Sequence, residues 1–322
     1  MKAYALTGPD KPAELVTLPK PEVGPREVLV AIRAASVNGF DVYQASGGLT
    51  GMMEHRYPTV IGRDFAGVVE AVGSEIGDFA AGDEVFGFVP SAPPLEHGSF
   101  AEYLAADTLV LARKPADLDF ETAAALPLAG SAALDLLDAV HVKDGETLLI
   151  VGATGGVGSL AVQLAAKRGA TVIATARPDE EAFRELGAAQ TIDYSAGSVA
   201  DAVRAAYPDG ITALIDVVDQ KDALTELGSV VHSGGRVASL LGAADVDALA
   251  ARDITATNVA ATPTSEKLDR LAELVGSGEL RVLIQGAYPL DQVADAIEAF
   301  KQGTRGKLIV RLGGGAIYAG RA

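Results

Sequence analysis

Residues 148–177 read LLIVGATGGVGSLAVQLAAKRGATVIATAR, and this stretch predicts the fold of the middle of the chain. Its apolar run 148–151 is typical of a buried strand, and the glycine-rich turn Gly152–Gly158 follows at once. Helical periodicity over 160–167 and a second apolar run at 171–175 complete a strand–helix–strand unit. Parallel neighbouring strands need such a crossover helix, so the stretch predicts a parallel sheet covered by helices.

The same alternation continues toward the C-terminus. Three further strand-like runs, separated by segments with helical periodicity, lie at 191–193, 212–217 and 236–240. Before residue 120 the rhythm is different, because short runs rich in β-branched and aromatic residues follow one another with turn signals between them. A doubly wound parallel sheet is therefore expected after a β-rich barrel or sandwich.

The glycine-rich turn also predicts a chemical function. Glycines there allow the backbone to approach a pyrophosphate, and the start of the following helix offers unpaired N–H groups and a positive dipole end. We expect Thr154, Gly155, Gly156 and Val157 to bind a dinucleotide cofactor. An ordinary glycine-rich turn is the alternative, which the complete strand–helix–strand context disfavours.

The second strand of the unit indicates which cofactor. NAD-dependent proteins usually place an acidic residue at the end of this strand to bind the ribose 2′-hydroxyl. Here no acidic residue precedes Asp179, whereas Arg177 can form a forked contact with a 2′-phosphate and Thr175 can donate a hydrogen bond to it. This pattern favours NADP(H). In the alternative interpretation, Arg177 is a solvated loop residue partly neutralised by Asp179 and Glu180.

Composition excludes several classes of protein. The 322 residues include 43 acidic and 26 basic side chains, a formal net charge of −17, which disfavours binding to nucleic acid or to anionic lipid. With no cysteine, the chain has no disulfide, thiol nucleophile or cysteine-ligated metal. No secretory signal or membrane-spanning apolar run is recognised, so we expect a cytoplasmic protein without a membrane partner.

Several motifs lie in one consistent order along the chain. They are GPREVLVAIRAASVNGFD (24–41), GRDFAGVVEAVG (62–73), AGDEVFG (81–87), GSFAEY (98–103), AALPLAGSAAL (124–134), the glycine-rich turn, and GKLIV (306–310). With these motifs the chain resembles the zinc-independent quinone oxidoreductase branch, which includes ζ-crystallin-like proteins, of the medium-chain dehydrogenase/reductase superfamily.

This resemblance implies an α/β fold in which a Rossmann doubly wound parallel sheet is inserted in a GroES-like, β-rich catalytic domain. The changes in composition place the catalytic domain at 1–119 and 262–322, and the Rossmann domain at 120–261. The resemblance also implies a homodimer.

Zinc-dependent members of the superfamily carry a Cys-x-x-Asp ligand segment and a Gly-His-Glu ligand segment. At the matching places this chain has Asn38 to Asp41 and Gly62-Arg63-Asp64. A guanidinium does not ligate zinc and no thiolate exists, so we expect no metal. Without a Lewis acid, reactions that spread negative charge over an enolate or hydroquinone are favoured. The resemblance then implies NADPH-dependent reduction of a quinone or an α,β-unsaturated carbonyl compound.

The resemblance also suggests particular site residues. Asn38 and Tyr43 are the candidate catalytic residues: Asn38 as a donor to a substrate oxygen or to the nicotinamide ribose, and Tyr43 as a donor to the developing oxyanion or a source of the proton. Packing in the wall of the site is an equal alternative for Tyr43. Tyr194 is expected beside the 2′-phosphate, and Leu241 and Gly242 beside the nicotinamide.

Two other functions remain open at this stage. An enoyl-thioester reductase would need a channel lined with basic groups for the pantetheine phosphates, against which the net charge argues. A low-turnover NADPH-binding sensor or structural protein is suggested by Ala132, which stands where the family usually has threonine, and by Val217-Val218, which replaces a glycine-containing turn.

Overall fold

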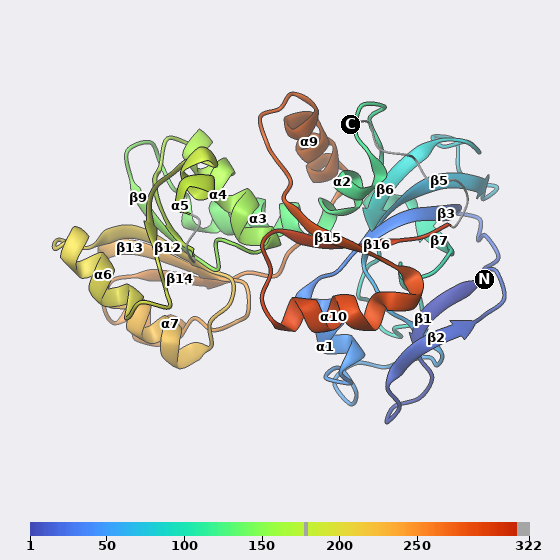
Figure 1. Cartoon of the computed structure of the whole chain (residues 1–322), viewed down its shortest axis with the longest axis horizontal. Coiled ribbons are helices and arrows are strands. Elements are labelled where there is room, and N and C mark those ends of the chain that lie inside the picture. Colours follow the sequence, from blue (N-terminus) through green and yellow to red (C-terminus); the bar gives the residue numbers. More distant parts are fainter. Residues whose placement is uncertain (177–179, 314–322) are drawn as a thin grey trace. The chain divides into compact units, whose positions relative to one another are not determined.

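The computed structural model describes residues 1–176 and 180–313, and it divides the chain into two compact units (Figure 1). Unit 1 contains Met1–Pro127, Gly286–Gln302 and the described residues from Leu308 onward. Unit 2 contains Leu128–Gln285 and Gly303–Lys307. Each unit has a hydrophobic core of its own.

Unit 2 is built on six parallel strands, β11-β10-β9-β12-β13-β14 in spatial order. This is the order 3-2-1-4-5-6 of a dinucleotide-binding fold, so the predicted doubly wound sheet is confirmed. The strands are β9 (Thr147–Val151), β10 (Thr171–Thr175), β11 (Ala188–Ile192), β12 (Ile211–Asp216), β13 (Val231–Ser239) and β14 (Thr255–Asn258). Strand β14 has no counterpart among the predicted strands, because its sequence TATN has only one apolar residue and lies at the sheet edge.

Helices cover both faces of this sheet: in Figure 1, α4 and α5 lie on one side and α6 and α7 on the other. The helices after the first unit are α3 (Pro127–Val140), α4 (Gly156–Lys167), α5 (Glu180–Glu185), α6 (Val199–Ala206), α7 (Lys221–Gly228), α8 (Val246–Ala250) and α9 (Ser265–Gly276). The helical stretch expected over 120–140 is divided into α2 (Phe120–Ala124) and α3. Pro127 explains the break, since proline starts a helix well but disfavours helical backbone at the residue before it.

The bounds of the units differ from those expected from composition, 120 and 262. Helix α9 lies in unit 2 because its fully buried Leu271 packs directly on Gly130 of α3. Lys267 of α9 also forms an ion pair with Asp135 of α3. The return to unit 1 comes only at Gly286, inside strand β15 (Ile284–Pro289).

Unit 1 is β-rich, as predicted. A three-stranded sheet has the order β2-β1-β4, and a seven-stranded sheet has the order β15-β16-β3-β5-β6-β8 with β7 paired to β3. The strands are β1 (Lys2–Leu6), β2 (Ala13–Thr17), β3 (Glu27–Ser36), β4 (Thr59–Val60), β5 (Asp64–Val72), β6 (Glu84–Phe88), β7 (Tyr103–Asp107), β8 (Leu111–Arg113), β15, and β16 (Lys307–Arg311).

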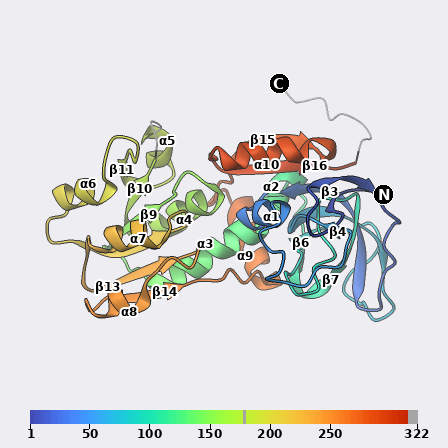
Figure 2. The ribbon, with the colours of Figure 1, turned by 90° about the horizontal axis from the view of Figure 1, so that it is seen from below.

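Helix α2 packs on β3, β5 and β6 of the larger sheet of unit 1, and two further helices contact each other. Helix α10 (Val293–Lys301) lies beside β15 and β16 in both views of the ribbon (Figures 1 and 2). It also contacts α1 (Gly39–Ala45), where the Phe300 ring approaches Gly39. The core of unit 1 joins Val30 and Phe65 of the sheet to Val293 of α10.

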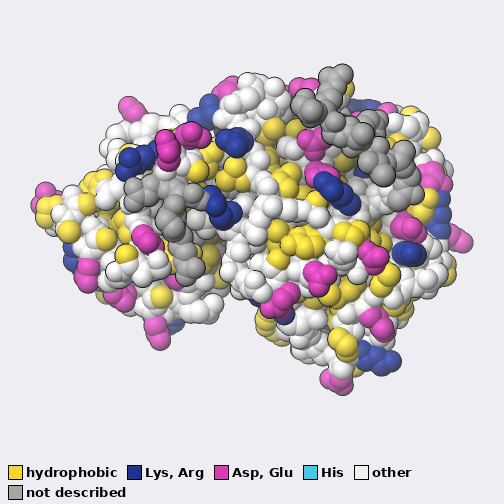
Figure 3. Space-filling view, viewed as in Figure 1, with side chains coloured by type: hydrophobic (Ala, Val, Ile, Leu, Met, Phe, Trp, Pro, Cys, Tyr) yellow, Lys and Arg dark blue, Asp and Glu magenta, His cyan; other side chains and the backbone are white. Residues whose placement is uncertain are grey.

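Charged side chains of both signs lie on the face of the molecule seen in Figure 3. On the face shown in Figure 3, acidic and basic side chains are interspersed, and no continuous basic field is visible outside the grey atoms. Among the described residues, no helix is both long enough and apolar enough to cross a bilayer.

Replacing Leu271 with alanine tests whether α9 is an integral part of unit 2. The side chain is fully buried against Gly130, so L271A should lower the free energy of unfolding by about 2–4 kcal/mol. Glu273→Ala on the exposed side of the same helix is the control and should change it by less than about 0.5 kcal/mol. Urea unfolding followed by circular dichroism provides the measurement, and equal midpoints for both variants would show that α9 packs loosely.

Candidate functional site

The glycine-rich turn lies at the carboxyl end of β9, next to β12, where the strand order of the sheet reverses. In open α/β sheets this is the general place for a ligand. Helix α4 begins at Gly156 with Gly155 as its N-cap. A methyl group at Gly158 would overlap the carbonyl oxygen of Gly152, so glycine is required for this close approach of helix and turn.

The turn has the properties that a pyrophosphate needs. Thr154, Gly155, Gly156 and Val157 are all partly accessible, unlike the strand before them and the helix after them. The first N–H groups of α4, a helix of 12 residues, have no intrahelical acceptors and concentrate a partial positive charge. The residues present therefore fit the diphosphate of a dinucleotide.

A segment far away in the sequence closes on this turn, and sequence reasoning missed its role. The backbone N–H of Gly306 donates to the carbonyl oxygen of Thr154 at 2.7 Å, and the methylenes of the buried Lys307 lie on Gly156. In the sequence, these two residues stand out only as part of the motif GKLIV, on which the family resemblance partly rests. Their contact with a turn about 150 residues earlier is a product of topology, which no local pattern reports.

Of the residues predicted to bind the 2′-phosphate, Thr175 and Tyr194 do not share one environment. Thr175 is 2% exposed, and its hydroxyl accepts from the N–H of Gly152 at 3.0 Å and donates to the carbonyl of Ile150 at 3.4 Å. Its hydroxyl thus holds β10 to the turn and has no hydrogen left for a phosphate. Tyr194 is 45% exposed at the carboxyl end of β11, the neighbour of β10. Arg177 lies outside the described residues.

The predicted nicotinamide residues follow the carboxyl end of β13, the neighbour of β12. Leu241 is 53% exposed, and Gly242 follows with a positive φ of 73°. At the end of β12, the buried Asp216 orders the next turn by accepting from the N–H groups of Val218 at 3.3 Å and Asp219 at 3.1 Å. Burial, followed by repulsion from the Asp219 carboxylate, raises the pKa of Asp216 to about 6.

In unit 1, the start of α1 is held by buried polar contacts. The amide nitrogen of the Asn38 side chain donates to Asp64 Oδ2 at 2.9 Å and to the Ser36 carbonyl at 3.4 Å. The Asn38 backbone N–H donates to Asp41 Oδ2 at 2.8 Å, which caps the helix. Asn38 is only 7% exposed. The donor that sequence reasoning assigned to a substrate or ribose oxygen is therefore directed at protein acceptors.

Tyr43, by contrast, is a half-exposed residue of α1. It is 49% exposed, and its ring lies so close to Gly48 that a methyl group there would overlap it. The backbone N–H of Gly48 and the hydroxyl of Ser46 both donate to the Tyr43 carbonyl, at 3.0 and 2.8 Å. The loop after α1 thus fixes the direction of the Tyr43 ring, and the Tyr43 hydroxyl donates to the sulfur of Met52 in the same loop at 3.7 Å, a weak acceptor that a substrate oxygen could replace.

Arg63 is a buried cation that sequence reasoning treats only as a replacement for a metal ligand. It is 1% exposed, and its Nη1 donates to the Pro90 carbonyl and its Nη2 to Gln44 Oε1, both at 3.2 Å. The guanidinium lies 4.8 Å from the centre of the Phe40 ring. Burial lowers the pKa of Arg63 and the nearby Asp41 carboxylate raises it, and an arginine stays charged in any case.

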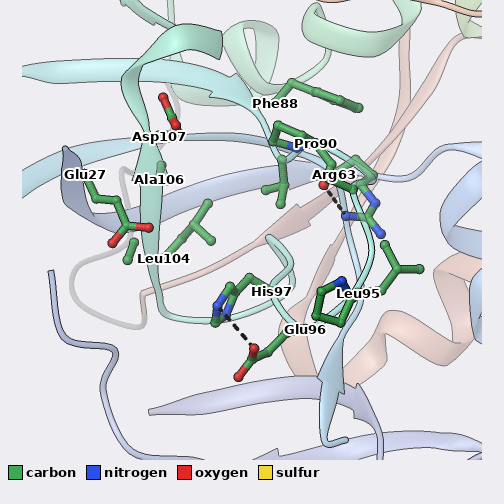
Figure 4. Close-up of a pocket in the computed structure, with 14 residues that line it drawn as sticks. Glu27, Arg63, Phe88, Pro90, Leu95, Glu96, His97, Leu104, Ala106 and Asp107 are labelled. Carbon is green, nitrogen blue, oxygen red and sulfur yellow. Dashed lines mark hydrogen bonds and ion pairs between the residues drawn. The ribbon is translucent and has the colours of Figure 1, made fainter. Parts of the chain in front are cut away.

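Arg63 is also part of the wall of a cavity of about 160 Å³ in unit 1 (Figure 4). The segment 88–97 and strand β7 form most of this wall. His97 is at its rim, 3.9 Å from Glu96, and its side chain is 61% exposed. No sequence pattern indicates this cavity, because its existence depends on the shape of the 88–97 loop.

Metal ligation has no obvious place in the described part of the chain. No three histidine, aspartate or glutamate side chains there form a group that could hold an ion.

Two family models match the chain. The alcohol dehydrogenase GroES-like domain matches residues 24–116, and the zinc-binding dehydrogenase model matches residues 186–310.

Relatives and solved structures agree with these matches. The chain is 32% identical over 299 residues to an NADPH-dependent alkenal/one oxidoreductase of Arabidopsis thaliana, covering 90% of this chain and 73% of that protein. It is 32% identical over 331 residues to a quinone oxidoreductase of Sus scrofa, covering 97% of both chains. The quinone oxidoreductase structure from Coxiella burnetii superposes with a TM-score of 0.87 at 29% identity, covering 97% of this chain and 98% of that chain.

The carboxyl of Asp216 gives a pH-dependent prediction. The pKa of Asp216 is about 6 in the folded protein, above the ordinary value of 3.8. The folded state is therefore more stable, relative to the unfolded chain, when this carboxyl is neutral. That stabilisation is complete below pH 4 and is lost as the pH rises through about 6. Asp216→Asn keeps the acceptor for Val218 and Asp219 without the charge, and should raise the unfolding free energy by about 1–2 kcal/mol at pH 8.

At pH 4 the same variant should match the parent chain, because the parent carboxyl is then mostly neutral. Thermal and urea unfolding between pH 4 and pH 8 would measure the difference. A gain that is independent of pH would show that the Asp216 charge is not what destabilises the folded state.

Proposed function

The chain belongs to the medium-chain dehydrogenase/reductase superfamily, and on that premise we propose that it is an NADPH-dependent enzyme that reduces quinones or α,β-unsaturated carbonyl compounds. The observation that carries the proposal is the glycine-rich turn, with the start of α4, at the reversal point of a 3-2-1-4-5-6 sheet. Relatives that share nearly the full length are named as alkenal/one and quinone oxidoreductases, which supports this class of acceptor.

Residues of unit 2 would hold the cofactor. Thr154, Gly155, Gly156 and Val157 offer backbone N–H groups and partial positive charge to the diphosphate. Arg177 and Tyr194 would bind the 2′-phosphate, and Leu241 and Gly242 would border the nicotinamide. Thr175 supports this site indirectly, because its hydroxyl fixes the turn at Gly152.

When bound, NADPH supplies a hydride, which with one proton completes the two-electron reduction of the acceptor. The hydroxyl of Tyr43 can donate a hydrogen bond to the oxygen that becomes negative, or pass on the proton, and water can serve for a quinone. Asn38 holds the first turn of α1 through Asp64 and so positions the helix that carries Tyr43.

We also propose that the reaction needs no zinc, although one matching family model is described as a zinc-binding dehydrogenase. The Asn38 amide nitrogen is a hydrogen-bond donor to Asp64, and the Arg63 guanidinium is a buried cation. Neither this amide nitrogen nor the guanidinium can ligate a cation, and the chain has no thiolate to supply the usual zinc ligand. An acceptor whose charge spreads over an enolate or a hydroquinone suits such a site.

The assembly and location of the protein are further proposals. A homodimer is supported by strand β14, which lies at the edge of the parallel sheet with mostly exposed residues. A cytoplasmic location rests on the sequence composition alone.

Oxidation of NADPH and NADH, followed at 340 nm with quinones and 2-alkenals as acceptors, tests the activity. We expect turnover with NADPH preferred, and Arg177→Ala should raise the KM for NADPH by about tenfold or more while the KM for NADH changes little. Binding of NADPH without turnover of any acceptor would contradict the reductase function and favour a sensor. A preference for NADH would contradict the cofactor assignment.

Gly48→Ala tests the role of Tyr43. The added methyl group must displace the Tyr43 ring, so kcat/KM for an enone should fall by about tenfold or more, with the KM for NADPH unchanged. Gly77→Ala is the matched control, since a methyl group there meets no atom within 4 Å. Unchanged kinetics in G48A would mean that Tyr43 is only part of the wall.

A further inference from the structure

The turn that follows strand β12, residues 217–219, lies directly on the glycine-rich turn of unit 2. A methyl group at Gly152 would overlap the side chains of Val217 and Val218. The backbone N–H of Val217 also donates to the carbonyl oxygen of Val151 at 3.3 Å. Val217 and Val218 replace a glycine-containing turn of the family, and the proposed function gives them no role. Their contact with Gly152 places the turn after β12 beside the segment proposed to bind the diphosphate.

Asp216, the last residue of β12, fixes the shape of this turn. Its side chain is fully buried, and Oδ1 accepts from the N–H groups of Val218 at 3.3 Å and of Asp219 at 3.1 Å. In the sheet, Asp216 pairs with Val151 of β9 on one side and with Ser239 of β13 on the other. The carboxyl group therefore lies at the point where the strand order of the sheet reverses.

The other oxygen of this carboxyl group, Oδ2, is also buried, and no N–H or O–H group of the described residues donates to it. The Asp219 side chain forms a hydrogen bond with the Asp216 side chain. Ionised carboxylates only accept hydrogen bonds, so two carboxyl groups can form one only when a proton lies between them. Since Oδ1 already accepts twice, Oδ2 is the oxygen of Asp216 that is left to hold this proton.

Within the described ranges, Asp219 is the one charged group whose influence on Asp216 is resolved. Burial, followed by repulsion from Asp219, raises the pKa of Asp216 to about 6, and burial raises the pKa of Asp219. Lys221, in the first turn of α7, forms an ion pair with Asp245 at 2.9 Å. Neither neighbouring strand, β9 or β13, ends in a charged residue. The pair therefore loses its proton close to neutral pH, where a small change in the local charge alters its occupancy.

We propose that Asp216 and Asp219 share one proton, and that a dinucleotide binding to the neighbouring glycine-rich turn draws this proton from the solvent. A diphosphate brings negative charge to the start of α4, next to the pair, and so favours the neutral form of Asp216. In a partly desolvated space, a unit charge about 10 Å away changes the proton affinity of a carboxylate by about tenfold. The proton returns to the solvent when the dinucleotide leaves.

This proposal rests on the proposed function and adds a residue that makes the affinity for the cofactor depend on pH. Asp216 touches no reacting atom in it. It is a positioning residue, which acts on the glycine-rich turn through its charge and through Val217 and Val218.

Asp216→Asn tests the shared proton by imitating the neutral carboxyl at every pH. Asparagine keeps the Oδ1 acceptor, and its side-chain N–H can donate to the Asp219 carboxylate. At pH 8 the variant should bind NADPH about tenfold more tightly than the parent chain, and at pH 6 the two should agree within about twofold. Asp201→Asn, on the exposed side of α6 in the same unit, is the matched control and should bind like the parent at both pH values.

Proton uptake is measured directly by titration calorimetry with NADPH at pH 6.5, in two buffers of different ionisation enthalpy. The parent chain should take up about half a proton more than D216N. A phosphate monoester also titrates near pH 6, but its contribution is the same for both proteins, so the difference isolates Asp216. Equal uptake by the parent and D216N would overturn the proposal, and so would a ratio of their affinities that does not change with pH.

These measurements need no acceptor, so they separate the proposal from the reductase function. If NADPH binds with the expected uptake and no acceptor is reduced, the proposed function fails and the shared proton stands. If acceptors are reduced and the uptake of D216N equals that of the parent, the function stands and the role of Asp216 is wrong. If NADPH does not bind, both are wrong.

Discussion

Arg63 and Asp64 are oppositely charged, adjacent in the sequence and buried in unit 1. Each of them needs hydrogen-bond partners, and these partners come from the segments around them. A buried charge without partners costs several kcal/mol, so each of these groups must gather polar atoms from other segments. Asp64 accepts from Ser36 and Asn38, which fixes the end of β3 to the start of α1. Arg63 donates to the carbonyl oxygen of Pro90 and to the side-chain oxygen of Gln44. One dipeptide thereby determines where α1 begins, how it is oriented, and how the loop over the cavity is anchored.

The same dipeptide supports the proposal that the reaction needs no zinc. A zinc ion acts as a Lewis acid on the substrate oxygen, and it needs ligands that donate electron pairs. Where zinc-dependent members have a ligand, Arg63 places a fixed positive charge, whose Nη1 and Nη2 donate to the protein. The charge therefore stabilises the scaffold, and in the proposed reaction hydrogen-bond donors such as Tyr43 would stabilise the reduced acceptor.

Unit 2 follows a simpler physical rule. Its phosphate-binding turn is made of backbone, so its function depends on glycines that let chain segments approach, as at Gly158, and on a helix start that is left accessible. Because this chemistry is local, a stretch of 30 residues is enough to predict it. The hydroxyl of Thr175 shows the limit of such reasoning: a polar residue at the right strand end is buried and supports the turn.

The sequence alone determined the parallel sheet, the β-rich first part and the glycine-rich turn that leads into α4, because each is encoded by periodicity and glycine placement over a few consecutive residues. It also excluded thiol chemistry and disfavoured metal chemistry, because those depend on which residue types exist. Tertiary structure alone decided that Lys307 closes on Gly156, that α9 packs with unit 2, that the Asn38 amide points at Asp64, and that the 88–97 loop encloses a cavity. These contacts join segments separated by tens to hundreds of residues, and their formation depends on burial and on the pairing of polar groups, which no local pattern records.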